Sequence, residues 1–569
     1  MTSVALGPQY RQDILRDLAE TEFDVLVVGG GIVGSGAALD AISRGLSVAL
    51  VEARDWAAGT SSRSSKLIHG GLRYLEQRDF GLVREALRER TLLLHRLAPH
   101  LVRPVRFLYP LRNRVWERAY VSAGVTLYDT MGGARALPRH RQLTRRGALR
   151  EAPALRPDAL VGAIQYYDAQ VDDARYTMMV ARTAAQYGAK VATRAEMTGF
   201  LREGERVTGA HVLDLEGGRE IAVRARRVVC ATGVWTDGAQ AMTGSRASFA
   251  VQASKGVHLM VPRDRIPMGT GLITRTSKSV LFIIPWGRHW LVGTTDTPHE
   301  DGPDHCGGTT PHTPRNCLKE PVAAHTDIGY LLDQANAVLR TPLTHDDIEG
   351  VYAGLRPLLS GDMDDTTRLS REHAVAEPVP GMVVVTGGKF TTYRVMARDA
   401  VDVVAEGLDD AVPPSVTGRL PILGAVGFEV LWNERRRLAA GSGLHVARIE
   451  HLLHRYGSCA REVLDLVADD PMLGLPVPGA EDYLCAEAVY AVTHEGALHL
   501  EDVLARRLRI SIEEWDGGVA AASHVAELLA PRLGWGREEI ADEIKRYVLQ
   551  IAAERRGGPA VPETPVPAA

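Results

Sequence analysis

The chain has 569 residues, with 66 Lys and Arg against 70 Asp and Glu, which gives a formal net charge of −4. A hydrophobic content of 45% and a charged content of 24% exclude global disorder, collagen and coiled coil, and the length predicts about three or four domains. Five scattered cysteines without a CxxC motif favour a reducing compartment. No run approaches about 18 consecutive apolar residues, and the charged N-terminal stretch lacks the pattern of a secretory signal.

A βαβ unit is expected near the N-terminus. Residues 24–28 form an apolar run of strand length, residues 35–44 have a helical composition, and residues 47–51 form a second apolar run. The first strand and the helix are joined by a G-x-G-x-x-G loop, whose helix N-terminus binds a dinucleotide pyrophosphate, while an acidic residue after the second strand binds the ribose. The predicted cofactor-binding residues of this unit are Gly29, Gly31, Gly34 and Glu52.

Two later strands, at residues 227–233 and 382–388, also end in glycines. Both have the pattern of buried parallel strands whose carboxyl ends face a ligand crevice, which adds Gly233 and Gly388 to the predicted cofactor site. The chain has one fingerprint unit, and the matching strand ends follow hundreds of residues later. This arrangement favours a long, split FAD-binding domain over a compact NAD-binding domain.

The rest of the chain is expected to form two further domains. Alternating runs such as 280–284 and 290–293 predict a mostly antiparallel sheet, and the apolar spacing from about residue 430 onwards predicts a helical domain. The predicted boundaries are 20–105, 171–255 and 351–405 for the FAD-binding domain, 106–170 and 256–350 for the substrate domain, 420–555 for the helical domain, and 556–569 for a disordered tail.

A polar stretch at residues 299–326 predicts a flexible surface loop. It contains His305, Cys306, His312, Cys317 and His325, but their spacing matches no common zinc pattern, so no metal is expected. The helical domain contains no EF-hand calcium loop, so no calcium site is expected there.

Several motifs resemble those of the FAD-dependent glycerol-3-phosphate dehydrogenases. Residues 28–40 are similar to the first signature of that family, residues 387–394 to the second, and residues 60–75 to its flavin-proximal segment. The similarity runs from about Asp24 to about Arg398 and continues more loosely through the helical domain. Further matching segments are 171–175, 255–258, 284–286, 293–296 and 354–358.

The resemblance implies an α/β fold like that of D-amino-acid oxidase, with a Rossmann-like split FAD-binding domain, an inserted antiparallel-sheet substrate domain and a C-terminal all-helical domain. It implies noncovalent FAD, oxidation of sn-glycerol 3-phosphate to dihydroxyacetone phosphate, and transfer of the electrons to a membrane quinone. It places the substrate phosphate at Arg73 and Tyr74, and active-site roles at His258, Arg356 and Lys389. From the flavin-proximal segment it adds Ser61, Ser62, Lys66 and His69 to the cofactor-binding residues.

The chemistry of the reaction agrees with these roles. Arg73 can grip a phosphate dianion bidentately. Arg356 cannot be the base because a guanidinium stays protonated, so we expect it to stabilise the developing alkoxide. His258 is the candidate base, with His69 as the alternative. Lys389, ahead of a helix expected near Thr391, would direct positive potential at the flavin.

Residues 61–150 carry nineteen basic and six acidic side chains, a net charge of +13. Aromatic and apolar residues lie among the arginines, which suits docking on anionic lipid, with Phe107, Leu108 and Trp116 as candidate wedges. The alternative is a solvated face that adds to the positive field of the substrate site. We therefore expect a cytoplasmic protein bound peripherally to the inner face of the cell membrane.

Two other functions remain open. One is a related oxidase that passes electrons to oxygen, and the other is a flavoprotein that binds nucleic acid through the basic segment. No RNA-binding motif supports the second, so no nucleic-acid partner is expected. The oligomeric state is open, with a homodimer among the alternatives.

Overall fold

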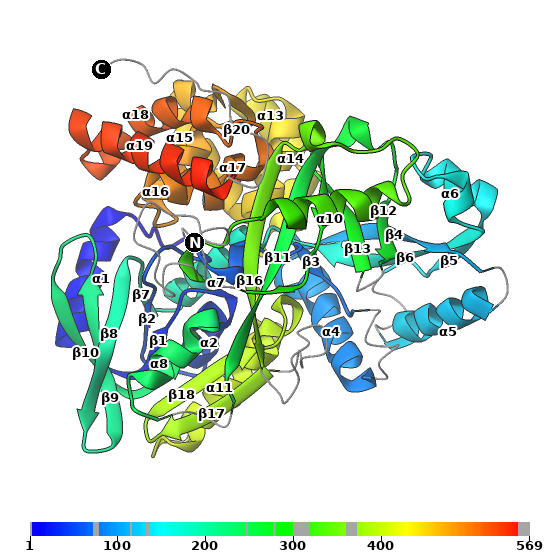
Figure 1. Ribbon diagram of the computed structural model, residues 1–569. Helices are drawn as coiled ribbons and strands as arrows, with labels where there is room; N and C mark the ends of the chain where they lie inside the picture. The colour runs from blue at the N-terminus through cyan, green and yellow to red at the C-terminus, as the bar shows by residue number, and fades with distance from the viewer. Residues whose placement is uncertain are drawn as a thin grey trace.

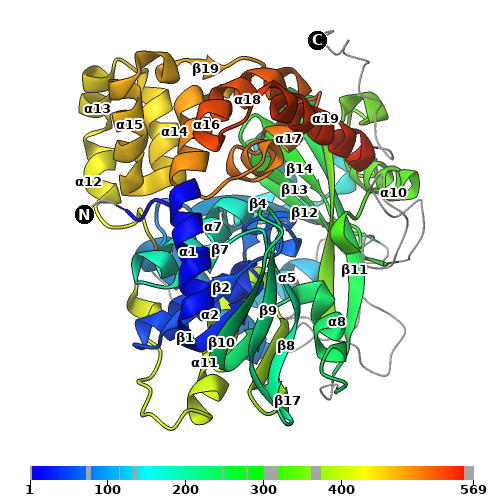
Figure 2. The same ribbon diagram turned by 90° about the vertical axis from the view of Figure 1, so that its left-hand side faces the viewer.

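The computed structural model describes residues 3–71, 79–113, 116–131, 137–245, 249–276, 280–299, 318–359 and 373–555. Figure 1 shows two neighbouring β-sheets with their flanking helices and, at the top, a group of helices from the C-terminal part of the chain. Figure 2 shows the same group above the N-terminal helix α1 (Pro8–Glu20) and the first sheet. This is the mixed α/β architecture that the sequence predicts.

The first sheet contains the strands predicted around the glycine motifs. Its order is β17-β18-β10-β1-β2-β7, in which β18, β10, β1, β2 and β7 pair in parallel. The carboxyl ends of β1, β10 and β18 therefore meet at one edge, as predicted. The strands of this sheet are β1 (Glu22–Val28), β2 (Val48–Val51), β7 (Lys190–Ala192), β8 (Ala195–Glu203), β9 (Arg206–Asp214), β10 (Glu220–Cys230), β17 (His373–Val379) and β18 (Met382–Gly387).

Both faces of this sheet are covered, which explains why β1 is an unbroken apolar run. Val25 and Val27 pack with the helices α2 (Ile32–Ser43), α7 (Asp173–Gln186) and α11 (Tyr393–Glu406). Leu26 and Val28 point to the opposite face, where α1 and the β8–β9 hairpin pack. Small residues bring α2 close to α11, since a Cβ at Gly36 would lie 2.9 Å from the Tyr393 ring.

The second sheet is mostly antiparallel, in the order β15-β11-β14-β13-β12-β4-β6-β3, with β16 on β11 and β5 on β6. The predicted domain boundaries do not follow the two sheets, because those at 105/106 and 255/256 fall inside β4 and β11. β16 lies in a segment that we assigned to the FAD-binding domain, but it pairs with β11 along its whole length. The strands are β3 (Leu67–Ile68), β4 (Arg103–Leu111), β5 (Arg141–Thr144), β6 (Gly162–Gln170), β11 (Val251–Pro262), β12 (Gly271–Arg275), β13 (Val280–Trp286), β14 (His289–Gly293), β15 (Thr297–Pro298) and β16 (Gly350–Leu359).

Helices flank this sheet on the right of Figure 1, where α4 (Phe80–Leu92), α5 (Trp116–Met131) and α6 (Arg145–Glu151) lie, while α10 (His325–Asn336) crosses in front of the strands. The prediction that Phe107 and Leu108 are membrane wedges is wrong. Both side chains are 0% exposed, because β4 is covered on its two faces. The side chain of Trp116, the third candidate wedge, lies outside the described part of the chain.

The C-terminal part is helical, as predicted, and contains one short hairpin, β19 (Pro476–Val477) with β20 (Ala480–Leu484), that the sequence pattern did not indicate. Ile449, Leu452, Leu453 and Tyr456, which follow the apolar spacing of a helix, are buried. The helices are α12 (Phe428–Asn433), α13 (Arg435–Ser442), α14 (Val446–Tyr456), α15 (Ala460–Asp469), α16 (Cys485–Thr493), α17 (Ile510–Glu513), α18 (Val519–Leu533) and α19 (Arg537–Glu554). The predicted tail, 556–569, lies outside the described residues. Among those described, no helix has the length and apolar character to span a bilayer.

Candidate active site

A cavity of about 650 Å³ lies between the two sheets. One wall comes from the loops that follow β1, β2, β10 and β18, and the opposite wall comes from β11 and β16. Most of the predicted site residues meet here although they are far apart in sequence. The predicted residues that line the cavity are Gly29, Gly31, Glu52, Ser61, His69, Gly233, His258, Arg356, Gly388 and Lys389.

The glycine loop places the N-terminus of α2 against the cavity. Gly29 has a φ of +112°, and a Cβ at Gly34 would lie 1.9 Å from the Gly29 carbonyl oxygen, so both positions require glycine. Gly31 caps the helix without a side chain, and the Ile32 N–H donates to Ser61 Oγ at 3.0 Å. Backbone N–H groups and the positive end of the helix dipole thus face the cavity, as a pyrophosphate requires.

The carboxylate of Glu52 is held at the end of β2. Oε2 accepts from the Gly30 N–H at 2.6 Å, and Oε1 accepts from the Arg54 N–H at 2.8 Å. Burial raises the pKa of Glu52, while these two hydrogen bonds oppose the rise. A fixed acceptor next to a helix N-terminus matches the ribose and pyrophosphate of a dinucleotide, so the cavity fits FAD.

His258 extends from β11 and is 2% exposed. Its Nε2 lies 2.8 Å from Ser65 Oγ, and its ring stacks on Tyr352 at a centroid distance of 4.9 Å. Burial, and then the positive charges of Arg356 and Lys66, hold the pKa of His258 well below its usual value. The imidazole is therefore neutral at pH 7 and able to accept a proton.

Arg356 extends from β16 into the same space. Its Nη2 donates at 3.0 Å to Thr294 Oγ1 and to the Thr295 carbonyl oxygen, and its Nη1 forms an ion pair with Asp296 at 3.3 Å. Gly256 makes room for it, because a Cβ there would lie 2.4 Å from Nη2. The guanidinium is thus fixed in direction beside His258 and remains 21% exposed.

Lys389 lies at the start of the short 3₁₀ turn Phe390–Thr392, which leads directly into α11. The loop before it is tight, since Gly387 and Gly388 have φ of +80° and +70°. The His69 N–H donates to Thr391 Oγ1 at 3.1 Å, which joins this turn to the segment after β3. The expected pairing of a lysine with a helix N-terminus at the cavity is therefore present.

Three predicted cofactor residues, Gly34, Ser62 and Lys66, lie outside the cavity lining. Lys66 is fully buried, and its ammonium donates to Asp173 Oδ1 at 2.8 Å and to the Ser62 carbonyl oxygen at 3.1 Å. The buried carboxylate of Asp173 holds the ammonium away from the cavity, so Lys66 stabilises the segment 60–66 on the side that faces away from the cavity. The left-handed backbone at Lys66, with φ of +57°, left no signal in the sequence.

Sequence reasoning did not single out Ser65, which contacts His258, or Asp173, which anchors Lys66. Both belong to segments whose motifs were recognised, and the polarity of the run 60–66 was the available signal.

The predicted phosphate ligands Arg73 and Tyr74 lie outside the described residues. So do His305, Cys306, His312 and Cys317, while His325 begins α10. Within the described ranges, no group of His, Cys, Asp and Glu is placed to hold a metal.

Comparison with known proteins identifies relatives over nearly the whole chain. The family described as FAD dependent oxidoreductase matches residues 24–402, and the C-terminal domain of alpha-glycerophosphate oxidase matches residues 415–540. Glycerol-3-phosphate dehydrogenase 2 of Mycobacterium tuberculosis is 54% identical over 552 residues, covering 97% of this chain and 92% of the relative. The glycerol-3-phosphate dehydrogenase of Mycobacterium leprae is 54% identical over 550 residues, with the same coverage.

Among solved structures, the glycerol-3-phosphate dehydrogenase from Bacillus halodurans complexed with FAD superposes with a TM-score of 0.78. It is 27% identical, and the match covers 97% of this chain and 98% of that one. The likeness therefore includes the C-terminal helices as well as both sheets.

Proposed function

Because this chain belongs to the FAD-dependent oxidoreductases, and among them to the glycerol-3-phosphate dehydrogenases, we propose that it oxidises sn-glycerol 3-phosphate to dihydroxyacetone phosphate and delivers the electrons to a membrane quinone. Its cofactor is FAD. The assignment of the substrate rests on the names of the relatives, and the assignment of the quinone rests on the resemblance of the motifs.

One observation carries the proposal. A single cavity is lined at one end by the glycine loop and Glu52, and also by His258, Arg356 and Lys389. The first group suits a dinucleotide, and the second combines a neutral imidazole with two cations. A small phosphorylated alcohol needs this combination, because it brings negative charge and must lose a hydroxyl proton.

Each side chain has a separate task in this proposal. FAD, when bound, supplies the two-electron acceptor for the hydrogen on the substrate's C2. His258 takes the hydroxyl proton at Nε2, either directly or through the Ser65 hydroxyl, which lies 2.8 Å away in the same cavity wall. Arg356 orients the C2 oxygen and stabilises its developing negative charge. Lys389 and the N-terminus of α11 supply positive potential at the edge of the cavity.

The acceptor is tested by comparing quinone reduction with peroxide formation. With glycerol 3-phosphate as the electron donor in air, we expect quinone reduction to match the dihydroxyacetone phosphate formed, with little peroxide. Peroxide formation equal to or greater than quinone reduction would instead support the oxidase alternative. The C-terminal family is named after an alpha-glycerophosphate oxidase.

A surface on α4 and α5 supports peripheral binding at the inner face of the cell membrane. Phe80 is 47% exposed and Leu127 is 40% exposed, and both border a hollow of about 580 Å³ together with Arg84. Exposed apolar side chains next to an arginine suit an anionic lipid surface. These residues replace Phe107 and Leu108 as the proposed wedges.

Vesicle flotation tests this surface. The double variant Phe80→Ser, Leu127→Ser should float less with anionic vesicles and lose activity with a long-chain quinone, while activity with a soluble dye is kept. The control replaces the exposed Val430 and Leu549 of the C-terminal helices with Ser. Normal flotation of the α4–α5 variant, or equal loss in the control, would exclude this surface.

A further inference from the structure

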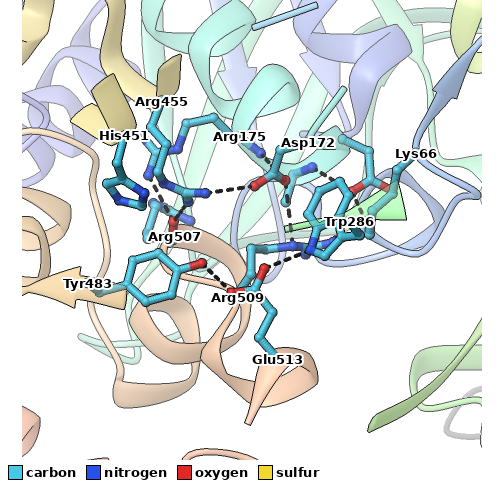
Figure 3. A network of polar contacts seen from close by, with 12 residues as sticks. Lys66, Asp172, Arg175, Trp286, His451, Arg455, Tyr483, Arg507, Arg509 and Glu513 are labelled. Atoms are coloured by element: carbon cyan, nitrogen blue, oxygen red, sulfur yellow. Dashed lines mark hydrogen bonds and ion pairs between the residues drawn. The ribbon is translucent and has the colours of Figure 1, made fainter. Parts of the chain in front are cut away.

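A buried polar network joins the C-terminal helices to the segment 60–66 that lines the cavity (Figure 3). It brings together Lys66 from that segment, Asp172 from the start of α7, and arginines from the C-terminal helices, among them Arg455, Arg507 and Arg509. In Figure 3 the two aromatic residues Trp286 and Tyr483 hold Glu513 beside Arg509; the Trp286 Nε1–H and the Tyr483 hydroxyl each donate to that carboxylate at 2.7 Å.

Asp173 is the point in this network that holds the segment. It is fully buried, and its Oδ2 accepts from the Ser64 N–H at 2.9 Å and from the Ser64 hydroxyl at 2.7 Å. Its Oδ1 accepts from Lys66 Nζ at 2.8 Å and from Arg509 Nη2 at 3.0 Å. One carboxylate therefore pairs with two cations and binds the segment on both sides of Ser65.

Arg509 reaches this point from the C-terminal part of the chain. It lies between the helical turn Asp502–Arg507 and α17, has a left-handed backbone with φ of +70°, and is 3% exposed. The same Nη2 that binds Asp173 also donates to the Ser62 carbonyl oxygen at 2.9 Å. A residue 447 positions further along the chain thus contacts both the segment and its anchor.

The segment in turn holds the proposed proton acceptor. Ser65 Oγ lies 2.8 Å from His258 Nε2, and the Tyr352 hydroxyl donates to the Ser64 carbonyl oxygen at 2.8 Å while its ring stacks on His258. A shift of the segment would therefore move both neighbours of the imidazole. Reacting groups are sensitive to such shifts, since a displacement of about 1 Å can lower a rate about 100-fold.

We propose that Arg509 of the C-terminal helices is a positioning residue, which holds the segment 60–66 against Asp173 and so keeps Ser65 and His258 in the geometry for proton removal from the substrate. The kinetic part of this proposal rests on the proposed function, whereas the order of the segment does not. The C-terminal helices are then part of the active-site scaffold.

The electrostatics favour a positioning role over a simple packing role. Asp173 pairs with the two buried cations Lys66 and Arg509, and the neighbouring Asp172 forms ion pairs with Arg509 and Arg455. Removing one member of a buried pair leaves an uncompensated charge, so loss of Arg509 alters how Asp173 holds Ser64 and Lys66. A neighbouring arginine lacks this connection, because Arg507 binds Asp55 with both Nη atoms at 2.7 Å and does not contact the segment.

Two measurements on the FAD-bound enzyme test the proposal. Hydrogen exchange followed by mass spectrometry reports the order of segment 60–66 without any substrate, and anaerobic stopped-flow reduction by glycerol 3-phosphate reports the chemistry. In Arg509→Met we expect faster hydrogen exchange in 60–66 than in the wild type. The reduction rate at saturating substrate should be about 10–100-fold lower than that of the wild type, while the apparent substrate affinity stays within about threefold. Arg509→Lys keeps a donor and a charge, and should recover part of both effects.

Arg507→Met is the matched control, since it breaks a buried contact between the same two parts of the chain. It should lower thermal stability but leave exchange in 60–66 and the saturated rate close to wild type. If Arg509→Met fails to fold, Asp173→Asn replaces it, because an amide has one acceptor oxygen and cannot accept both from Ser64 and from the two cations. The proposal would be overturned if hydrogen exchange in 60–66 stayed at the wild-type rate in either variant, or if Arg507→Met changed exchange and reduction as much as Arg509→Met does. If glycerol 3-phosphate failed to reduce the flavin of the wild-type enzyme, the proposed substrate would be rejected instead.

Discussion

At the scale of single residues, His258 combines burial with a contact to a hydroxyl. Burial, and then Arg356 and Lys66, keep its pKa well below the usual value, so the ring stays neutral as the pH falls through 6.5. Such a ring accepts a proton during the reaction but holds it weakly, and the Ser65 hydroxyl offers an exit. This environment distinguishes His258 from the alternative base, His69, which is held at its backbone by Thr391.

The first prediction concerns the pH dependence of reduction. Since the neutral imidazole is the active form, activity is lost only when the pH falls through the depressed pKa of His258. The reduction rate at saturating substrate should therefore be constant from about pH 9 down to about pH 6. The pH range in which the rate falls should lie below about pH 6. An acid limb centred near pH 6.5 or above would contradict this environment for the base.

Replacement of the base gives the second prediction. His258→Gln should lower the reduction rate by about 10²–10⁴-fold, the usual contribution of general base catalysis, while FAD is retained. His69→Gln is the control and should stay within about tenfold of wild type, as expected when general base catalysis is retained. A larger effect at His69 than at His258 would reverse the assignment.

The two arginines should fail in different ways, which is the third prediction. Arg73→Ala should mainly weaken substrate binding, because a phosphate is held equally in the ground state and the transition state. Arg356→Ala should lower the rate even at saturation, because the alkoxide charge develops only during reaction. Stopped-flow reduction at varied substrate concentration separates the two, and exchanged defects would show that the roles are wrong.

At the scale of elements, the β1–loop–α2 unit provides the tightest constraint on cofactor binding. Gly34 has no room for a methyl group, since its Cβ would lie 1.9 Å from the Gly29 carbonyl oxygen. We predict that Gly34→Ala abolishes FAD retention on gel filtration. Gly329→Ala is the control, because that helical glycine has open space around its Cβ and should be neutral or stabilising by about 0.4–1 kcal/mol. Full FAD content in Gly34→Ala would contradict the loop's role.

Elements with local signals were predictable from the sequence. The β1–α2 unit and the glycines after β10 and β18 follow from short motifs, and these place Gly29, Glu52, Gly233 and Gly388 correctly at the cavity. Pairing partners were not predictable in this way. The apolar run of β16 suits either sheet, and its ten-residue register with β11 is formed by residues about 100 positions away.

The direction of single side chains was the other limit. The motif in 60–66 belongs to a segment that lines the cavity, but the sequence does not show that Lys66 turns away from the cavity while Ser65 faces it. That choice depends on Asp173 and Arg509, which lie far along the chain. In the same way Phe107 and Leu108 are apolar residues among arginines, and only the packing of two layers on β4 shows that they are buried.

At the scale of the whole molecule, His499 links three parts of the chain. Its Nε2 lies 2.9 Å from Glu216 after β9, and its Nδ1 lies 2.9 Å from Glu543 on α19. Burial opposes a charge on this ring, but the hydrogen bonds to the two carboxylates outweigh it and raise the pKa of His499 to about 9. The imidazolium is therefore present at pH 7 and joins the C-terminal helices to the first sheet.

The fourth prediction follows from this raised pKa. A group whose pKa is higher in the folded protein stabilises fully below its unfolded pKa, about 6.5, and loses that effect as the pH rises through about 9. The difference in melting temperature between wild type and His499→Gln should therefore be largest near pH 6 and shrink by pH 9.5. The exposed His345 provides a control variant, His345→Gln. A constant or growing difference would contradict a protonated bridge.

The central claim is that one cavity brings FAD together with the groups that oxidise glycerol 3-phosphate. Anaerobic titration of the FAD-bound protein with glycerol 3-phosphate, followed by the absorbance of the oxidised flavin, tests it most directly. We predict that about one equivalent of substrate per flavin bleaches the absorbance with no nicotinamide present, because the substrate donates two electrons and FAD accepts two. An unchanged spectrum at saturating glycerol 3-phosphate, in a protein that dithionite still reduces, would contradict the account.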